Sequence, residues 1–391
     1  MKIFVFALLF IALMPAYAQL KSIEPSAQTG TSAAVVVDNV PLTHTSQVFP
    51  FNKAGDIIGK NDIPAQIRQV FKNAEVILED SNSDFDHIVK LNIHVSSEKY
   101  IPQIKRQLAL KFPGKTKPAV TYLIYKLWNG ADVAMDIVAA SKMTEKNVSY
   151  FSQNTAYHSF TTKAAVLPAG GVTYISGQAI KGPLQPGTHG TLQQLDASLK
   201  YLGMDKRGVV QIRAFMNTTA DISVVEKELA AYFGEALIPP VVYVEWLSKE
   251  YEIEIELIAA SPKATTQRDT TVTFLDLPGM AHSPVYSKAT QLNFGKRVYF
   301  SALYGTTLND ANAQTEEIFL VLKNLMHAAG CDFTHLAKAT YFHTTDAGSL
   351  AFNSIRPQYY YPKQAPAASK AMFKALPDGK MVGMDMIGAA K

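Results

Sequence analysis

The order of hydrophobic and polar residues repeats along the chain. Residues 66–78 have apolar side chains at helical spacing, and residues 87–95 then alternate between apolar and polar like a strand. The same order of helix, short loop and strand returns at residues 314–326 and 335–343. A weaker copy runs through residues 192–216. The pattern therefore predicts three copies of one helix–loop–strand unit.

Each copy continues in the same way, with an amphipathic helix, an extended segment led by proline, and a final strand. The second helices are expected at residues 100–112, 222–233 and 349–360, and the final strands at residues 133–139, 253–259 and 382–388. The prolines of the extended segments, Pro118, Pro239 and Pro366, are 121 and 127 residues apart. This spacing is about a third of the chain, so we predict three tandem α+β domains.

The first eighteen residues have the features of an export signal. Lys2 precedes an apolar run over residues 3–14, and Ala16-Tyr17-Ala18 is a small-x-small cleavage site. The run is too short to span a bilayer comfortably. The alternative to an export signal is a buried N-terminal strand. We expect an exported protein, periplasmic or secreted, with no membrane association after cleavage.

Domain boundaries follow from the repeats and from the polar stretches that separate them. Residues 1–18 are the expected signal peptide and residues 19–40 an expected linker. The three domains are then expected at residues 41–140, 157–261 and 281–391. Polar segments near residues 141–156 and 262–281 are interpreted as the connections between them.

Composition narrows the classes of function. Hydrophobic residues make up 48% of the chain and charged residues 18%, which argues against a disordered or nucleic-acid-coating protein. A net charge of +4 requires no polyanionic partner. The single cysteine, Cys331, excludes an intrachain disulfide framework and a cysteine zinc cluster. The histidines show no metal-ligand spacing, so we expect no metal and no cofactor.

Short motifs in the second and third copies carry a resemblance to a known family. Residues 285–291 (VYSKATQ), 297–301 (RVYFS) and 173–178 (TYISGQ) resemble the opening strands of the RidA family, also called YjgF or L-PSP endoribonuclease-like. The resemblance covers nearly all of residues 41–391. It implies a chorismate-mutase-like fold, in which a mixed β-sheet packs on two helices.

The family's assembly has a consequence for a chain with three domains. Its members are typically homotrimers with ligand clefts at the three subunit interfaces. The resemblance therefore implies a monomer that is an intramolecular pseudo-trimer, with up to three non-equivalent clefts for a small-molecule ligand. The alternative is three separate domains that trimerise with other chains.

The resemblance also implies an activity, the hydrolysis of reactive imines and enamines. In the family an arginine after Pro-Ala clamps the substrate carboxylate. Val120, Val241 and Ala368 stand at that place, so a carboxylate there would lose its strongest contacts. We therefore expect a divergent deaminase-like hydrolase acting at an inter-domain cleft. A non-catalytic small-molecule binding protein with degenerate clefts is the alternative.

The final strands each carry an acid at the place of the family's glutamate, namely Asp136, Glu256 and Asp385. One interpretation is a proton shuttle or a group that holds water at the cleft. The other interpretation is a carboxylate at a solvated strand end.

The third copy retains more of the family's pocket than the others. Tyr286 matches the pocket tyrosine and Asn353 the pocket asparagine, whereas in the first copy Thr45 or its neighbours stand at the tyrosine's place. Lys370, two residues beyond the vacant arginine position, is a candidate to replace the lost charge. A plain surface lysine is the alternative.

Ribonuclease activity is a third interpretation, prompted by one of the family's names. Residues 99–117 hold six basic residues and no acidic residue, a composition able to contact phosphates. Helical spacing favours a solvated face instead, so no nucleic-acid partner is expected.

Overall fold

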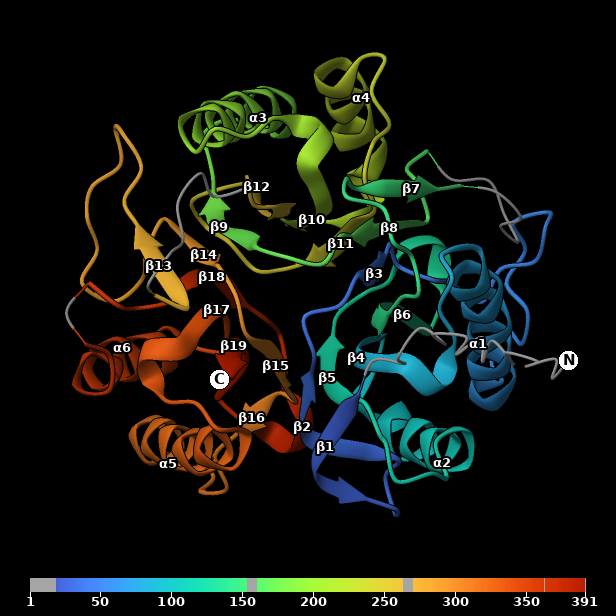
Figure 1. Ribbon diagram of the computed structural model, residues 1–391. Helices are drawn as coiled ribbons and strands as arrows, with labels where there is room; N and C mark the ends of the chain where they lie inside the picture. The colour runs from blue at the N-terminus through green and yellow to red at the C-terminus, as the bar shows by residue number, and fades with distance from the viewer. Residues whose placement is uncertain (1–18, 153–159, 263–269, 362, 391) are drawn as a thin grey trace, which may run out of the picture.

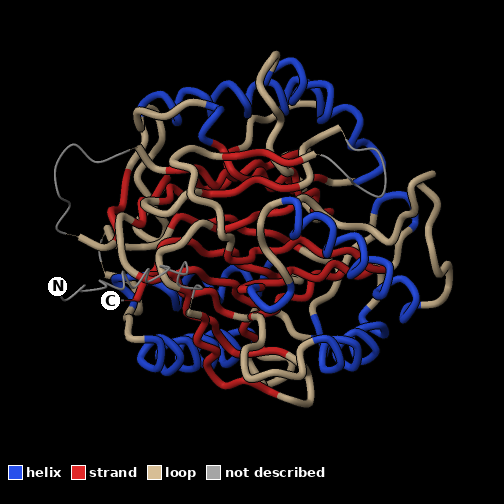
Figure 2. Tube along the Cα trace, turned by 45° about the vertical axis from the view of Figure 1, so that its right-hand side comes forward, coloured by secondary structure: helices blue, strands red, loops and turns tan. Residues whose placement is uncertain are grey.

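The computed structural model describes residues 19–152, 160–262, 270–361 and 363–390. Three α+β units surround a common centre, with their sheets inside and their helices outside (Figure 1). Figure 2 shows the same layering from a second direction. The expected export signal lies outside the described residues. Within the described ranges, no helix is long and apolar enough to cross a membrane.

The repeat order expected from the sequence is confirmed in each unit. The first unit contains β1 (Leu20–Ser26), β2 (Thr31–Val37), β3 (Leu42–Thr45), α1 (Ile63–Asp80), β4 (Ile88–Val95), α2 (Ile101–Lys111), β5 (Ala119–Ile124) and β6 (Val133–Ala140). The second contains β7 (Ser149–Phe151), β8 (Ala164–Leu167), β9 (Val172–Gln178), α3 (Leu184–Tyr201), β10 (Val209–Met216), α4 (Ile222–Phe233), β11 (Val241–Glu245) and β12 (Ile253–Ala260). The third contains β13 (Val272–Leu275), β14 (Ala289–Leu292), β15 (Lys296–Phe300), β16 (Leu303–Tyr304), α5 (Ala311–Ala329), β17 (Leu336–His343), α6 (Asp346–Ile355), β18 (Ala367–Met372) and β19 (Val382–Ala390).

Local sequence explains where the helices begin and end. The Asp62 carboxylate accepts a hydrogen bond from the Ala65 amide and so caps α1, and α5 begins in the same way at Asp310. α5 ends at Gly330, whose φ of 81° is the left-handed conformation that glycine adopts without strain. α6 is shorter than expected because a 3-10 turn containing Pro357 follows Ile355.

Each unit's sheet is completed by a hairpin from the next unit. Strand β3 of the first unit pairs with β8 of the second, and β9 of the second pairs with β14 of the third. The third unit's β15 pairs with β2, the N-terminal hairpin, with Val298 opposite Val36. The exchange is therefore cyclic, and the start of the described chain closes onto its last unit.

This exchange corrects the expected domain boundaries. Residues 19–40 are not a linker, because β1 and β2 form a hairpin in the third unit's sheet. The residues of β2 read TSAAVVV and are mostly buried, as a central strand requires. Strands β7 and β13 likewise lie within the stretches interpreted as connections. A strand that pairs with another unit looks like a connector when only its own unit is considered.

Of the five hydrophobic clusters of the described residues, four account for the layering. Three of them lie between a sheet and its own two helices, one cluster for each unit. The fourth lies on the inner faces of the sheets and contains Val89, Val210 and Ala337, one residue from the same position in each unit. Arg297, fully buried, adds polar links by donating to the carbonyls of Val40 and Gly170. The three units therefore share one core.

Candidate functional site

Equivalent strands place polar side chains around the centre. In all three sheets the same register brings the acid of the final strand opposite one residue of the neighbouring strand. Asp136 lies opposite Asn92, Glu256 opposite Arg213, and Asp385 opposite Thr340. The three acids are therefore structurally equivalent, as the sequence repeat predicted.

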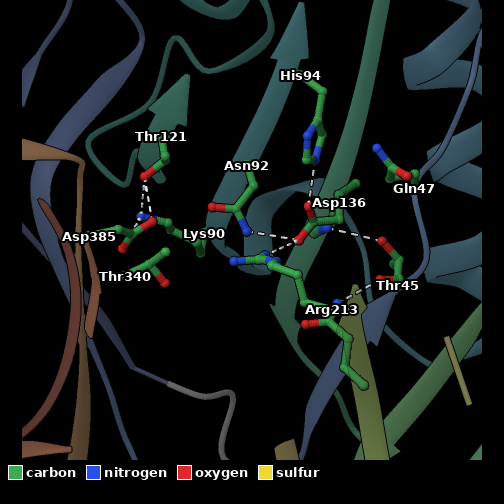
Figure 3. A network of polar contacts seen from close by, with 12 residues as sticks. Thr45, Gln47, Lys90, Asn92, His94, Thr121, Asp136, Arg213, Thr340 and Asp385 are labelled. Atoms are coloured by element: carbon green, nitrogen blue, oxygen red, sulfur yellow. Dashed lines mark hydrogen bonds and ion pairs between the residues drawn. The ribbon is translucent and has the colours of Figure 1, made fainter. Parts of the chain in front are cut away.

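Each of these acids is paired with a cation from the following unit. Arg213 Nη2 lies 3.3 Å from Asp136 Oδ2, and Lys338 Nζ lies 2.7 Å from Glu256 Oε1. Lys90 Nζ, from the first unit, lies 3.0 Å from Asp385 Oδ1 and closes the cycle. Figure 3 shows the first and last of these pairs. We refer to the three pairs as the central ion-pair ring.

The acids of the ring are buried, so they are not at solvated strand ends. Asp136, Glu256 and Asp385 are 0%, 3% and 8% exposed. Hydroxyl groups from the next unit complete two of the sites, because Thr121 donates to Asp385 and Ser369 donates to Glu256. A buried carboxylate needs such partners to offset its loss of hydration. A proton-shuttle role for the three acids stays a prediction.

Asp136 has the most extensive network (Figure 3). His94 Nε2 and Asn92 Nδ2 each lie 2.7 Å from its carboxylate oxygens. Burial by itself would raise the pKa of Asp136, but the Arg213 guanidinium and the His94 and Asn92 hydrogen bonds outweigh it and lower that pKa. Burial lowers the pKa of His94. The other ring nitrogen of His94, Nδ1, lies 2.7 Å from Tyr125 Oη, so His94 links Asp136 to Tyr125.

The ring surrounds a small central cavity. The volume of this cavity is about 40 Å³. Its lining includes five charged residues of the ring, Lys90, Arg213, Glu256, Lys338 and Asp385. This space has room for only a few water molecules. Substrate-sized space lies instead in the clefts between units.

The cleft between the second and third units, which we call cleft 2–3, is a pocket of about 360 Å³. Its second-unit wall contains Gly177 and Glu254, and its third-unit wall contains Tyr286 and Lys288. The Lys288 ammonium donates to Tyr286 Oη. The sequence prediction of Tyr286 as a pocket residue is therefore consistent with its position.

Ala368, at one of the vacant arginine positions, borders this cleft through its backbone. Its amide donates to Ser176 Oγ at 2.7 Å, and the Gly177 amide donates to Ser369 Oγ at 3.1 Å. These two bonds join the second unit to the third along the cleft. The backbone thus places position 368 beside the pocket, but alanine supplies no charge.

Glu254 is a site residue that sequence reasoning missed. Its Oε1 is buried and has no hydrogen-bond partner within the described part of the chain. The carboxyl lies against Gly177, where an added Cβ would come within 1.9 Å of Oε1. Burial, together with the nearby Glu256, raises the pKa of Glu254 to about 8. Glu254 therefore carries a proton at neutral pH and faces the pocket as an acid.

A comparison of the copies would have found Glu254. The residues two positions before the ring acids are Ala134, Glu254 and Gly383, so the second unit alone has an acid there. Alternation along a strand puts this residue on the same face as the ring acid.

The cleft between the first and second units, cleft 1–2, is a separate pocket of about 270 Å³. Ser46, Gln47 and Lys163 line it together with Val241, another vacant arginine position. Several of its wall residues are aromatic. Its chemistry therefore differs from that of cleft 2–3.

A tyrosine packs into the cleft between the third and first units, cleft 3–1. The Val120 amide donates to Ser301 Oγ at 2.7 Å, in the same way that Ala368 donates to Ser176. The ring of Tyr304 packs over Gly383, where an added Cβ would come within 2.6 Å of its Cε1. Tyr304 Oη also donates to the Tyr122 carbonyl at 3.3 Å. Val120 is consequently buried beside protein atoms.

Two predicted residues lie outside the pocket lining of cleft 2–3. Asn353 and Lys370 are exposed, and Lys370 Nζ contacts Ser349 Oγ on α6 at 3.3 Å. The Lys370 charge is close enough to oppose the upward shift of the Glu254 pKa. Lys370 is therefore a residue near the cleft rather than a fixed clamp.

The expectation for Thr45 is wrong. At each unit boundary, one hydroxyl donates a hydrogen bond to the carbonyl of the residue just before the proline of an extended segment. The three hydroxyl residues are Ser32, Thr162 and Ser287. The residue before each of them is Thr31, Thr161 or Tyr286, so Thr31 is the first unit's counterpart of the tyrosine. The hairpin of residues 20–37, which looks like a linker in the sequence, supplies this position instead of Thr45.

Comparisons with known proteins agree with this architecture. The family model "Endoribonuclease L-PSP" matches residues 21–141 and 151–261. The chain belongs to this family, the RidA family. Protein DfrA of Myxococcus xanthus is 31% identical over 112 residues, which are 27% of this chain and 85% of DfrA. Protein HMF1 of Saccharomyces cerevisiae is 30% identical over 120 residues, 30% of this chain and 89% of HMF1.

Solved structures each match about a third of the chain. The Rid protein YyfB from Yersinia pestis is 21% identical, with a TM-score of 0.29, and covers 31% of this chain and 98% of its own. Yeast Mmf1 is 25% identical, with a TM-score of 0.25, and covers 32% of this chain and 100% of its own.

Proposed function

We propose that the protein is a divergent RidA-family hydrolase of imines or enamines, and that cleft 2–3 is its reaction site. The observation that supports this proposal most directly is the protonated carboxyl of Glu254 in a pocket between two units, where Oε1 has no hydrogen-bond partner among the described residues. A buried acid with a pKa near the working pH is suited to proton transfer. Family membership supplies the class of reaction.

The reaction needs one proton donor and one water molecule. Glu254 protonates the imine nitrogen, which makes the carbon electrophilic, and water adds to that carbon. The resulting carbinolamine returns a proton to Glu254 and expels the amine as the carbonyl forms. Overall, an imine and water give a carbonyl compound and an amine, and Glu254 ends in its starting state.

The opposite wall of the cleft orients the substrate. Lys288 and Tyr286 place an ammonium and a hydroxyl there, and the pair is joined by a hydrogen bond. An ammonium binds an acceptor as a point charge, whereas an arginine fork binds a carboxylate with two parallel bonds. We therefore expect looser selection of the substrate's carboxylate than an arginine would impose.

Ribonuclease activity has less support because the basic stretch already has partners within the protein. The ammonium groups of Lys99, Lys105 and Lys111 lie over the aromatic rings of Tyr100, Tyr122 and Phe85 respectively. Lys117 is buried and donates to the Phe112 and Gly114 carbonyls. Few of these charges are available to a phosphate backbone.

Imine hydrolysis by the purified protein tests the proposal. An amino-acid oxidase generates imines from acidic, apolar and aromatic amino acids, and their decay is followed with and without the protein. We expect acceleration, and we expect Glu254→Gln to reduce it by about a hundredfold or more because glutamine has no proton to donate. Glu250→Gln is the matched control, since Glu250 is an exposed residue of the same unit, paired with Lys181.

Two results would contradict the proposal. No acceleration with any of the imines would favour the alternative, a non-catalytic binding protein. Full activity of the Glu254→Gln variant would show that the acid lies elsewhere. The second result requires that the variant unfolds at the same temperature as the unmodified protein.

A further inference from the structure

Much of the wall of cleft 1–2 is apolar, which suits an apolar ligand. Phe49, Trp128, Ile222 and Val241 contribute to its walls. The Phe49 and Trp128 rings are 5.8 Å apart at 70°, an edge-to-face arrangement. The first two come from the first unit and the last two from the second, so the pocket exists only because the units are joined. Apolar walls with a few convergent polar groups are typical of small-molecule sites.

The polar groups of this cleft include two hydroxyls without partners. Ser46 is 4% exposed and Tyr243 is 8% exposed, and both line the pocket. Ser46 Oγ and Tyr243 Oη have no hydrogen-bond partner among the residues that the structure describes. Buried hydroxyls without a partner are rare, and a ligand with an acceptor group would satisfy them.

A chain of hydrogen bonds holds the floor of the pocket in place. Gln47 Oε1 accepts from the Tyr243 amide at 3.0 Å, and Gln47 Nε2 donates to Tyr125 Oη at 2.9 Å. Tyr125 bonds in turn to His94, which bonds to Asp136 of the ion-pair ring. The floor is therefore anchored to the centre of the molecule and is formed before a ligand arrives.

A buried lysine supplies the reactive group of this cleft. Lys163 is 4% exposed and lines the pocket together with Glu226. Burial lowers the pKa of Lys163 to about 7, although the Glu226 charge acts in the opposite direction. A large share of Lys163 is thus an uncharged, nucleophilic amine near neutral pH. Because Lys163 and Glu226 have opposite charges when ionised, the pocket favours a neutral ligand over an anion.

We propose that cleft 1–2 is a second ligand site, which takes a neutral aromatic aldehyde or ketone and binds it covalently as an imine of Lys163. The Nζ lone pair forms the C–N bond, and the carbonyl oxygen becomes a hydroxyl near Ser46 and Tyr243. That oxygen then leaves as water with the two protons of the amine. Atoms balance as amine plus carbonyl giving imine plus water, with no oxidation or reduction.

The equivalent lysine of cleft 2–3 provides an internal comparison. Lys288 stands one residue after Ser287, as Lys163 stands one residue after Thr162. Its Nζ donates to Tyr286 Oη, and its side chain is only partly buried. Lys163 is the more deeply buried of the two lysines, and selective reaction is expected at Lys163.

Reductive trapping tests the proposal. The full chain is incubated at pH 7.5 with benzaldehyde and cyanoborohydride, which converts an imine into a stable secondary amine, and the labelled lysines are mapped by mass spectrometry. An ordinary lysine is neutral in only about one molecule in a thousand at this pH. We expect Lys163 to be labelled at least about tenfold faster than any other lysine.

Two variants and a smaller probe sharpen the result. Lys163→Met removes the amine but keeps an apolar straight chain, and we expect loss of the fast-labelling site. Lys323→Met, on the exposed face of α5, should leave fast labelling unchanged. Acetaldehyde, which lacks a ring, should label Lys163 with less selectivity.

Equal labelling of Lys163 and exposed lysines would overturn the proposal, as would protection of Lys163 from all labelling. If Lys163→Met does not fold, the map of the unmodified protein still decides. The readout identifies the labelled residue directly, so it does not depend on hydrolysis at cleft 2–3.

Discussion

Clefts 1–2 and 2–3 have the same framework and different contents. In each cleft a serine at a strand end faces the vacant arginine position of the next unit. The serine is Ser46 in cleft 1–2, where the position is Val241, and Ser176 in cleft 2–3, where it is Ala368. Cleft 2–3 adds a protonated acid, Glu254, whereas cleft 1–2 adds aromatic walls and a buried amine, Lys163. In a homotrimer one substitution would alter three clefts at once. With three units on one chain, each cleft is able to change separately.

The centre of the molecule, unlike the clefts, keeps the same type of contact in all three units. Every unit supplies one buried acid and receives one cation across a unit boundary. The cations vary in type and position, since Lys90 and Lys338 are equivalent but Arg213 stands two residues further along its strand. The pairing is nevertheless kept in all three. Joining the units constrains the centre and leaves the clefts free to diverge.

The largest expected effect comes from breaking the ring's ion pair between the first and second units. Arg213→Met leaves the Asp136 carboxylate buried without its cation, and we expect the free energy of unfolding to fall by about 3–5 kcal/mol. Chemical denaturation measures this free energy of unfolding. Lys181→Met is the control, because it breaks the exposed Lys181–Glu250 pair and should leave the denaturation midpoint unchanged. If Arg213→Met also left the denaturation midpoint unchanged, the ring would not hold the units together.

The two clefts should respond to pH in opposite directions. Glu254 acts in its protonated form and has a pKa of about 8, so imine hydrolysis should fall about tenfold for each pH unit above that value. Lys163 reacts as a neutral amine with a pKa of about 7, so its capacity for imine formation should rise as pH passes through 7. Rate–pH profiles of hydrolysis and of Lys163 labelling measure the two effects. Profiles of the same direction would contradict this assignment of an acid to one cleft and an amine to the other.

The repeat and the order of its elements could be predicted from the sequence. Periodicity separates helix from strand, and the spacing of Pro118, Pro239 and Pro366 sets the length of a unit. The vacant arginine positions also lie at boundaries between units. These features depend on local pattern or on direct comparison of the copies.

The exchange of hairpins could not be predicted in the same way. Alternation indicates which face of a strand is buried, but it does not identify the partner strand. Strand β2 therefore looked like part of a linker, although it pairs with β15 from the other end of the chain. The cations of the ring were missed for a related reason, because each comes from a different unit from the acid it pairs with.

The smallest expected effect concerns Lys370, which the sequence suggested as a replacement for the lost arginine. Its ammonium is exposed and contacts Ser349, so solvent and salt screen its charge from a ligand in cleft 2–3. We expect Lys370→Ala to raise the KM for an acidic imine by at most about threefold, and less at high salt, because exposed ion pairs contribute little. Lys374→Ala, at a neighbouring exposed position, is the control. A tenfold or larger loss specific to Lys370→Ala would restore the role of a clamp to this lysine, and cleft 2–3 would then select carboxylates much as a RidA protein with the arginine does.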